Sequence, residues 1–153
     1  MEIKLLQEFD FSDKNSLFGQ MDSMNDAIVK DIRESENALH ITLHKFDSIN
    51  GPNGEIIWPY KELEIEYEYA ENSRLDILVR EDVNVDRWMT LGEFLIWLKK
   101  KKAELEMNDW SITSYGALVL RLLAHPQNSV RKVFTIDVEI NLFPKKIVYR
   151  WKS

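Results

Sequence analysis

Four glutamates at alternate positions form the most distinctive chemical pattern in this sequence. A strand places all four carboxylates on one face, with neighbours about 6.6 Å apart, whereas a helix would scatter them around its circumference. That spacing is wide for direct ligands of one metal ion, and it resembles the carboxylate pairs of glycoside hydrolysis only superficially. We predict that Leu63, Ile65 and Tyr67 are buried and that Glu62, Glu64 and Glu66 are exposed. The row consists of Glu62, Glu64, Glu66 and Glu68.

The three histidines do not form a recognisable metal or catalytic site. His40 and His44 alternate with apolar residues on a predicted strand, where they share a face but lie about 13 Å apart. Two imidazoles at that distance cannot chelate one ion, so a structural or surface role is expected for both. His125 precedes Pro126 in a predicted turn, and we expect it to be exposed.

The remaining reactive or charged residues also lack a catalytic pattern. Lys99–Lys102 would spread around a helix, which predicts solvated surface and no nucleic-acid site. The chain has no Cys and only five Gly, and it contains no phosphate loop, nucleophile elbow, H-E-x-x-H motif or calcium loop. We therefore predict no catalytic residue, no metal and no cofactor, and an enzyme is the least favoured class.

Period-two alternation predicts that most of the chain forms strands, and one capping box predicts a helix. Thr90 and Glu93 fit that box, so a helix is expected over 91–107. Its apolar stripe would contain Leu91, Phe94, Leu95, Leu98 and Leu105. The expected strands cover 27–33, 38–46, 56–69, 75–79, 118–123, 130–140 and 147–151.

These elements predict an α+β fold in a single domain over residues 1–153. About seven mostly antiparallel strands would form a curved sheet or half-open barrel covered by the one long helix. The chain has 153 residues and is 44% hydrophobic, which suits one folded core. Neither a secretory signal nor a membrane-spanning run is evident, so we expect a cytoplasmic protein without a membrane partner.

Charge is distributed unevenly along the chain. Residues 1–86 carry a net charge of −12 and residues 87–153 carry +6, which together give the overall −6. Two interpretations stay open. The two parts can attract each other within one fold, leaving the glutamate row as a solvated face, or the acidic part can present an anionic strip to a basic partner.

The segments Asn25–Ile32 and Asn37–Leu43 resemble an opening hairpin of small uncharacterised bacterial proteins. Several of those proteins are grouped with immunity proteins of bacterial toxin systems. The resemblance covers about residues 24–44, and Asn25 stands where the typical pattern has His. It implies a β-rich domain with no catalytic residues to carry over, and a basic toxin as the class of partner.

The sequence does not identify the function, but it favours one class. The leading hypothesis is a non-catalytic protein-interaction domain, of the immunity or antitoxin type, that binds a basic partner through the glutamate row. The alternative is a small-molecule-binding β domain whose cavity would be lined by aromatic side chains. Those side chains are Trp58, Tyr60, Tyr67 and Trp151. The oligomeric state is left open.

Overall fold

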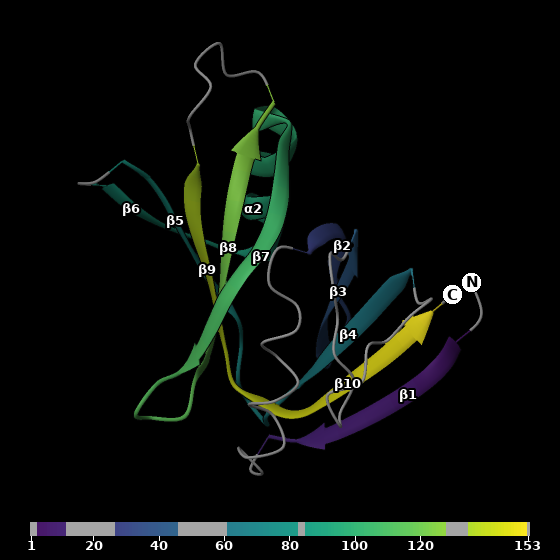
Figure 1. Cartoon of the computed structure of the whole chain (residues 1–153). Coiled ribbons are helices and arrows are strands. Elements are labelled where there is room, and N and C mark those ends of the chain that lie inside the picture. Colours follow the sequence, from purple (N-terminus) through teal and green to yellow (C-terminus); the bar gives the residue numbers. More distant parts are fainter. Residues whose placement is uncertain (1–2, 12–26, 46–60, 83–84, 128–134, 153) are drawn as a thin grey trace.

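The computed structural model describes residues 3–11, 27–45, 61–82, 85–127 and 135–152, and its main element is an open antiparallel sheet (Figure 1). In this part of the chain the sheet has ten strands in the order β1-β10-β4-β3-β2-β7-β8-β9-β5-β6. The strands are β1 (Ile3–Asp10), β2 (Ile28–Glu34), β3 (Ala38–His44), β4 (Glu62–Tyr69), β5 (Asp76–Asp82), β6 (Val85–Met89), β7 (Ala103–Ile112), β8 (Leu118–Pro126), β9 (Ile136–Leu142) and β10 (Pro144–Lys152). The helix in the described ranges is α2 (Leu91–Lys101).

The predicted α+β class and antiparallel pairing are confirmed, but the expected number of strands is wrong. The additional strands are β1, β6 and β7. The predicted helix over 91–107 also ends too late, because Lys102 adopts a left-handed conformation with φ 47° that closes α2. The chain then enters β7, in which Leu105 and Met107 are buried on one face.

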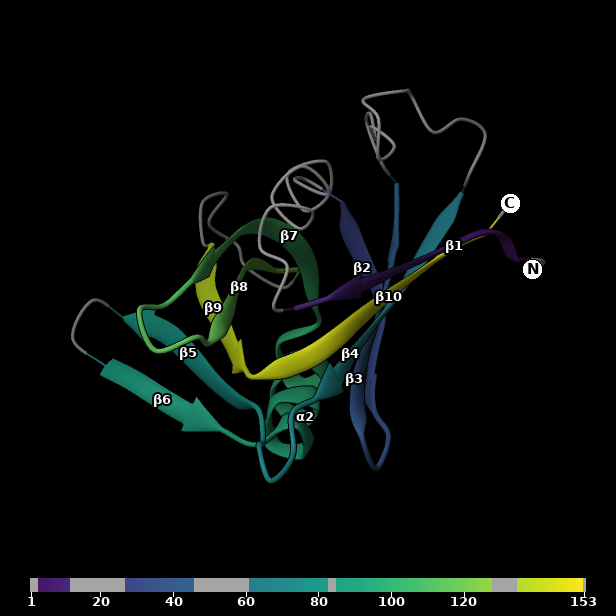
Figure 2. The same cartoon turned by 90° about the horizontal axis from the view of Figure 1, so that it is seen from below.

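The sheet divides into two groups of five strands that diverge from each other (Figures 1 and 2). Between β2 and β7 the ladder contains a single residue pair, Ile28 opposite Glu106. The groups are also joined by the chain itself at Phe143, between β9 and β10. The chain changes direction there, but β9 and β10 pair with other strands and not with each other.

One buried cluster contains side chains from both groups of strands. One part of it consists of three rows that cross β10, β4 and β3, because the register aligns their inward-facing residues. All nine side chains are 0% or 1% exposed, which confirms the predicted burial of the apolar residues of β4. The rows are Tyr149–Ile65–Ile41, Trp151–Leu63–Leu43 and Ile147–Tyr67–Leu39.

The start of α2 is as predicted. The Thr90 hydroxyl accepts a 3.2 Å hydrogen bond from the Glu93 amide, and the Glu93 carboxylate accepts one of 3.2 Å from the Thr90 amide. The predicted stripe needs correction, because Phe94 and Trp97 are buried whereas Leu95 is 38% exposed. In the described ranges no helix has the length and apolar character needed to cross a membrane.

Candidate functional site

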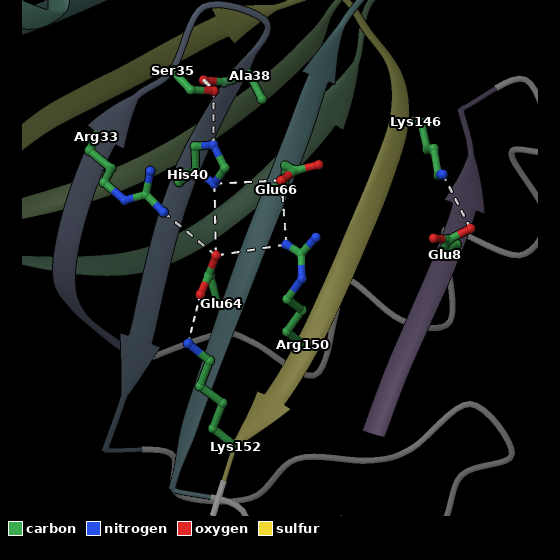
Figure 3. A network of polar contacts seen from close by, with 10 residues as sticks. All are labelled: Glu8, Arg33, Ser35, Ala38, His40, Glu64, Glu66, Lys146, Arg150 and Lys152. Atoms are coloured by element: carbon green, nitrogen blue, oxygen red, sulfur yellow. Dashed lines mark hydrogen bonds and ion pairs between the residues drawn. The ribbon is translucent and has the colours of Figure 1, made fainter. Parts of the chain in front are cut away.

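The glutamate row lies inside the sheet, between two strands that supply most of its polar neighbours. The register places Glu64 opposite Arg150 of β10, and Glu66 opposite His40 of β3. Arg33 of β2 is in turn opposite His40. Four adjacent strands therefore bring their outward-facing side chains into one network, drawn in Figure 3.

Each glutamate of the row has a cationic partner. Glu64 accepts a 2.7 Å hydrogen bond from Lys152 Nζ, and Arg33 and Arg150 lie 3.8 and 3.7 Å from its other oxygen. Glu66 lies 3.4 Å from Arg150 (Figure 3). At the ends of the row, Glu62 pairs with Lys30, and Glu68 pairs with Lys145 at 3.2 Å.

The prediction that Glu62, Glu64 and Glu66 are exposed is wrong. Glu62 is 7% exposed, and Glu64 and Glu66 are half-buried, as is Glu68. The reason is that β4 has strands on both sides, so long basic side chains from β10 and β2 lie over its carboxylates. Burial opposes ionisation of Glu64, but the hydrogen bond from Lys152 and the charges of Lys152, Arg150 and Arg33 outweigh it and lower the pKa of Glu64.

His40 is the most enclosed member of this network. Its side chain is 9% exposed, and its Nε2 lies 3.0 Å from Ser35 Oγ. Its Nδ1 lies 3.8 Å from both Glu64 and Glu66 and has no hydrogen-bond partner among the described residues. Burial and the charge of Arg33 lower the pKa of His40 more than the two carboxylates raise it. The lowered pKa favours the neutral imidazole, and the ring is buried between β2 and β4.

The ion pairs explain the uneven charge of the sequence. The basic strand β10 lies between two acidic strands, since Lys152 pairs with Glu64 of β4 and Lys146 pairs with Glu8 of β1 at 3.2 Å. The acidic and basic parts of the chain thus attract each other within the fold. The expected solvated lysine run is also partly paired, because Lys101 lies 3.3 Å from Glu81.

The other histidines are held in the sheet without forming a site for metal. His125 was expected to be exposed, but it is half-buried and its Nε2 lies 2.7 Å from Glu106. His44 is also half-buried, at the far end of β3 from His40. Within the described ranges, no group of His, Asp and Glu side chains is arranged to hold a metal ion.

Only two of the four aromatic residues named in the alternative hypothesis lie in the described part of the chain. Trp58 and Tyr60 lie outside the described residues. Tyr67 and Trp151 are fully buried in the core rows, and Trp151 Nε1 donates a 2.9 Å hydrogen bond to Gln7 Oε1. The hydroxyls of Tyr67 and Tyr149 are buried and have no hydrogen-bond partner in the described part of the chain.

A groove of about 610 Å³ lies where three distant stretches of the sequence meet. They are the β2–β3 turn at 34–36, the β4–β5 connection at 69–76, and the segment 88–93 that joins β6 to α2. Figure 2 shows the β4–β5 connection and the start of α2 beside the end of β6. We call this feature the acidic groove, because its carboxylates are Glu34, Glu36, Asp76 and Glu93, with Arg74 as its one cation among the lining residues.

The acids of the groove differ from the glutamate row in their pairing. Among the residues described, none of the four carboxylates takes part in an ion pair. Glu34 accepts a hydrogen bond from the Tyr69 hydroxyl, and Glu93 caps α2, whereas Glu36 and Asp76 are exposed. The lining therefore carries three negative charges in excess.

The groove also has an apolar wall. Trp88 is 62% exposed on it, and Leu75, Met89 and Leu91 form buried parts of the lining. Sequence reasoning did not find this site, because its residues come together only through the strand order. The one local signal is Trp88 itself, a large aromatic residue in a short segment of charged residues.

The segment that carries the family resemblance does form the expected hairpin. β2 and β3 pair in antiparallel register, and the Ser35 amide donates a 2.9 Å hydrogen bond to the Ala38 carbonyl across the turn. Hairpins of this kind occur in many folds, so the hairpin alone does not assign a family. Searches with this chain against protein-family models, curated proteins and solved structures found no match.

Proposed function

We propose that the protein is a non-catalytic interaction domain that binds a basic partner through the acidic groove. The observation that carries the proposal is the set of four carboxylates around one groove, none of them in an ion pair within the described residues. Carboxylates that pair with no cation among the described residues favour a cation from another molecule.

The shape and lining of the groove fit a lysine or arginine side chain. The aliphatic stem of such a residue can lie against the apolar wall while its charged end reaches the carboxylates. Exposed Trp88 offers a ring face for a cation, which is worth about 0.5–1 kcal/mol at an exposed site. The start of α2 adds a partial positive charge, which Glu93 offsets within the capping box.

The glutamate row is the weaker candidate for the contact surface. Partner binding by Glu62, Glu64, Glu66 and Glu68 stays a prediction. These carboxylates are already neutralised by cations of the same sheet, which a partner would have to displace. The cations are Lys30, Arg33, Lys145, Arg150 and Lys152. Exchanging one ion pair for another gains little free energy. A basic partner of the toxin class, which the resemblance implies, is compatible with the acidic groove.

The decisive experiment is titration of isotope-labelled protein with hexalysine, followed by NMR. We expect chemical-shift changes around Glu36, Asp76 and Trp88 that weaken as salt is added, because salt screens exposed charges. The variant Glu36→Lys/Asp76→Lys should lose them. Its matched control is Glu104→Lys/Asp137→Lys, which reverses two exposed acids outside the groove.

Two results would contradict the proposal. One is binding of hexalysine that the groove variant and the control variant weaken equally, since net charge alone would then explain it. The other is a set of shifts confined to β4 and β10, which would return the contact surface to the glutamate row.

The structure offers one observation in favour of the alternative, a small-molecule-binding β domain. The buried hydroxyls of Tyr67 and Tyr149 lack partners among the described residues, and a polar ligand would satisfy them. Thermal shift with a metabolite library tests this hypothesis. A ligand that stabilises the wild type but not Tyr67→Phe or Tyr149→Phe would support it.

A further inference from the structure

We propose that the partner supplies an extended basic segment that pairs with the free edge of β6 and places a lysine or arginine in the acidic groove. This inference rests on the proposed function and names the form in which the partner is recognised. β6 is the last strand of the sheet and pairs only with β5 among the described strands. Its outer edge therefore has backbone groups available to another strand.

The side chains of β6 do little to block its edge. Proteins often protect edge strands with lysine or proline, and β6 contains neither. Its two charged residues are engaged by β5, since Asp86 pairs with Arg80 at 3.3 Å and Arg87 pairs with Glu81 at 3.3 Å. Val85 is 49% exposed and Trp88 is 62% exposed. These two side chains lie three positions apart and so on opposite faces of the sheet, and an added strand would place a side chain of its own beside each of them.

The edge and the groove are continuous. Trp88 belongs to β6 and also lines the groove, and the groove continues through Met89 and Thr90 to the start of α2. A strand laid along β6 would therefore run toward the end of β6, where the β4–β5 connection and the start of α2 lie beside it (Figure 2) and where the carboxylates line the groove. Strand addition of this kind takes its affinity from main-chain hydrogen bonds and its specificity from alternate side chains.

Charge favours a foreign basic segment over a second copy of this chain. A second β6 would bring one basic residue, Arg87, which already pairs with Glu81. Each copy also carries a net charge of −6, which disfavours self-association. A segment with lysine or arginine at alternate positions would form backbone hydrogen bonds with the edge of β6 and place its basic side chains beside the carboxylates of the acidic groove.

The test compares three synthetic octapeptides by NMR and by calorimetry. The first alternates lysine with valine, the second has the same side chains with alternate backbone amides N-methylated, and the third has glutamate in place of lysine. We expect the first to bind with shifts at Val85–Met89 and slowed amide exchange in β6. N-methylation should weaken binding about tenfold or more, because it removes main-chain donors.

The outcomes separate this inference from the proposed function. Equal binding of the parent and N-methylated peptides overturns strand addition and leaves the acidic groove in place. Equal binding of the lysine and glutamate peptides overturns the basic partner, and with it this inference. Absence of binding by the lysine peptide overturns the inference as well. Concentration-dependent dimers of the free protein that Trp88→Lys abolishes would show that a second copy occupies the edge.

Discussion

Lys152 Nζ donates a 2.7 Å hydrogen bond to Glu64 Oε2, from a strand at the end of the chain to one in its acidic half. Arg150 and Arg33 also lie within 4 Å of the Glu64 carboxylate. This arrangement turns the most acidic segment of the sequence into a neutralised layer on the outer face of the sheet. The carboxylates of the acidic groove, by contrast, take part in no ion pair among the described residues.

Glu64→Gln should reduce the free energy of unfolding by about 1.5–3 kcal/mol, the usual worth of hydrogen bonds to charged groups. The neutral amide leaves three cations without their shared carboxylate. Lys152→Met should cost less, because Arg33 and Arg150 still neutralise Glu64. Urea denaturation measures both values, and Glu71→Gln, at an exposed position in a turn, is the control. A Glu64→Gln value no larger than that of the control would show that the network does not stabilise the fold.

His40 should make stability depend on pH. In the folded protein, burial and Arg33 lower the pKa of His40 below 6.5 against the effect of Glu66 and Glu64, and Arg150 lowers it further. The unfolded chain therefore binds this proton first as the pH falls. The stabilisation is complete above pH 6.5 and is lost as the pH falls from there through the folded pKa.

The measurement is the thermal midpoint of the wild type and of His40→Gln as the pH is lowered from neutral. The wild type should lose stability more steeply just below pH 6.5. Protonation of Glu64, whose folded pKa lies below 4.5, reduces stability only at lower pH, so the effects of the two residues are separable. His44→Gln controls for the loss of a histidine from β3. Parallel curves for wild type and His40→Gln would refute this assignment.

The sequence predicted those strands in which apolar and polar residues alternate in a pattern that fits a strand and does not fit a helix. β4 is the clearest case, because Leu63, Ile65 and Tyr67 alternate with glutamates and a helix cannot bury all three on one face. β7 was missed because its first residues, Ala103 to Met107, are good helix formers that follow a true helix. The signal overlooked there was the alternation of Leu105 and Met107 with glutamates, the same pattern as in β4.

Exposure of the glutamates and the position of the groove could not be predicted in this way. Both depend on which strands lie side by side, and strand order is set by contacts between residues far apart in the chain. Nothing near Glu64 in sequence indicates that Arg150 lies opposite to it. Likewise, Glu36 and Asp76 line one groove only because the β2–β3 turn and the β4–β5 connection meet there.

The capping box gives a prediction about α2. Thr90→Ala removes the acceptor for the Glu93 amide and should lower the free energy of unfolding by about 0.5–2 kcal/mol. Glu93→Gln should cost much less, because glutamine also serves at that position of a capping box. Chemical denaturation compares the two variants. An unchanged midpoint for Thr90→Ala would mean that the cap does not stabilise the helix.

The buried face of α2 can be distinguished from the exposed one by truncation. Phe94 is 0% exposed, so Phe94→Ala should destabilise the fold by about 3–5 kcal/mol. Leu95 is 38% exposed, and Leu95→Ala should have a clearly smaller effect, contrary to its expected place in the apolar stripe. If Phe94→Ala does not fold, Phe94→Leu gives a measurable value. Equal losses of unfolding free energy at the two positions would show that the buried face of α2 is not the one that contains Phe94.

Trp88 should matter for binding and little for stability. Its ring is 62% exposed, so Trp88→Ala should change the free energy of unfolding by no more than about 0.5 kcal/mol. Loss of a cation–π contact worth about 0.5–1 kcal/mol should weaken the binding of hexalysine about two- to fivefold. The matched control is Tyr115→Ala, which removes an aromatic ring that is 73% exposed in the β7–β8 connection, away from the groove. Calorimetry of both variants decides the matter. If both bind hexalysine as tightly as the wild type does, the apolar wall of the groove has no part in recognising the cation, and the carboxylates alone must account for it.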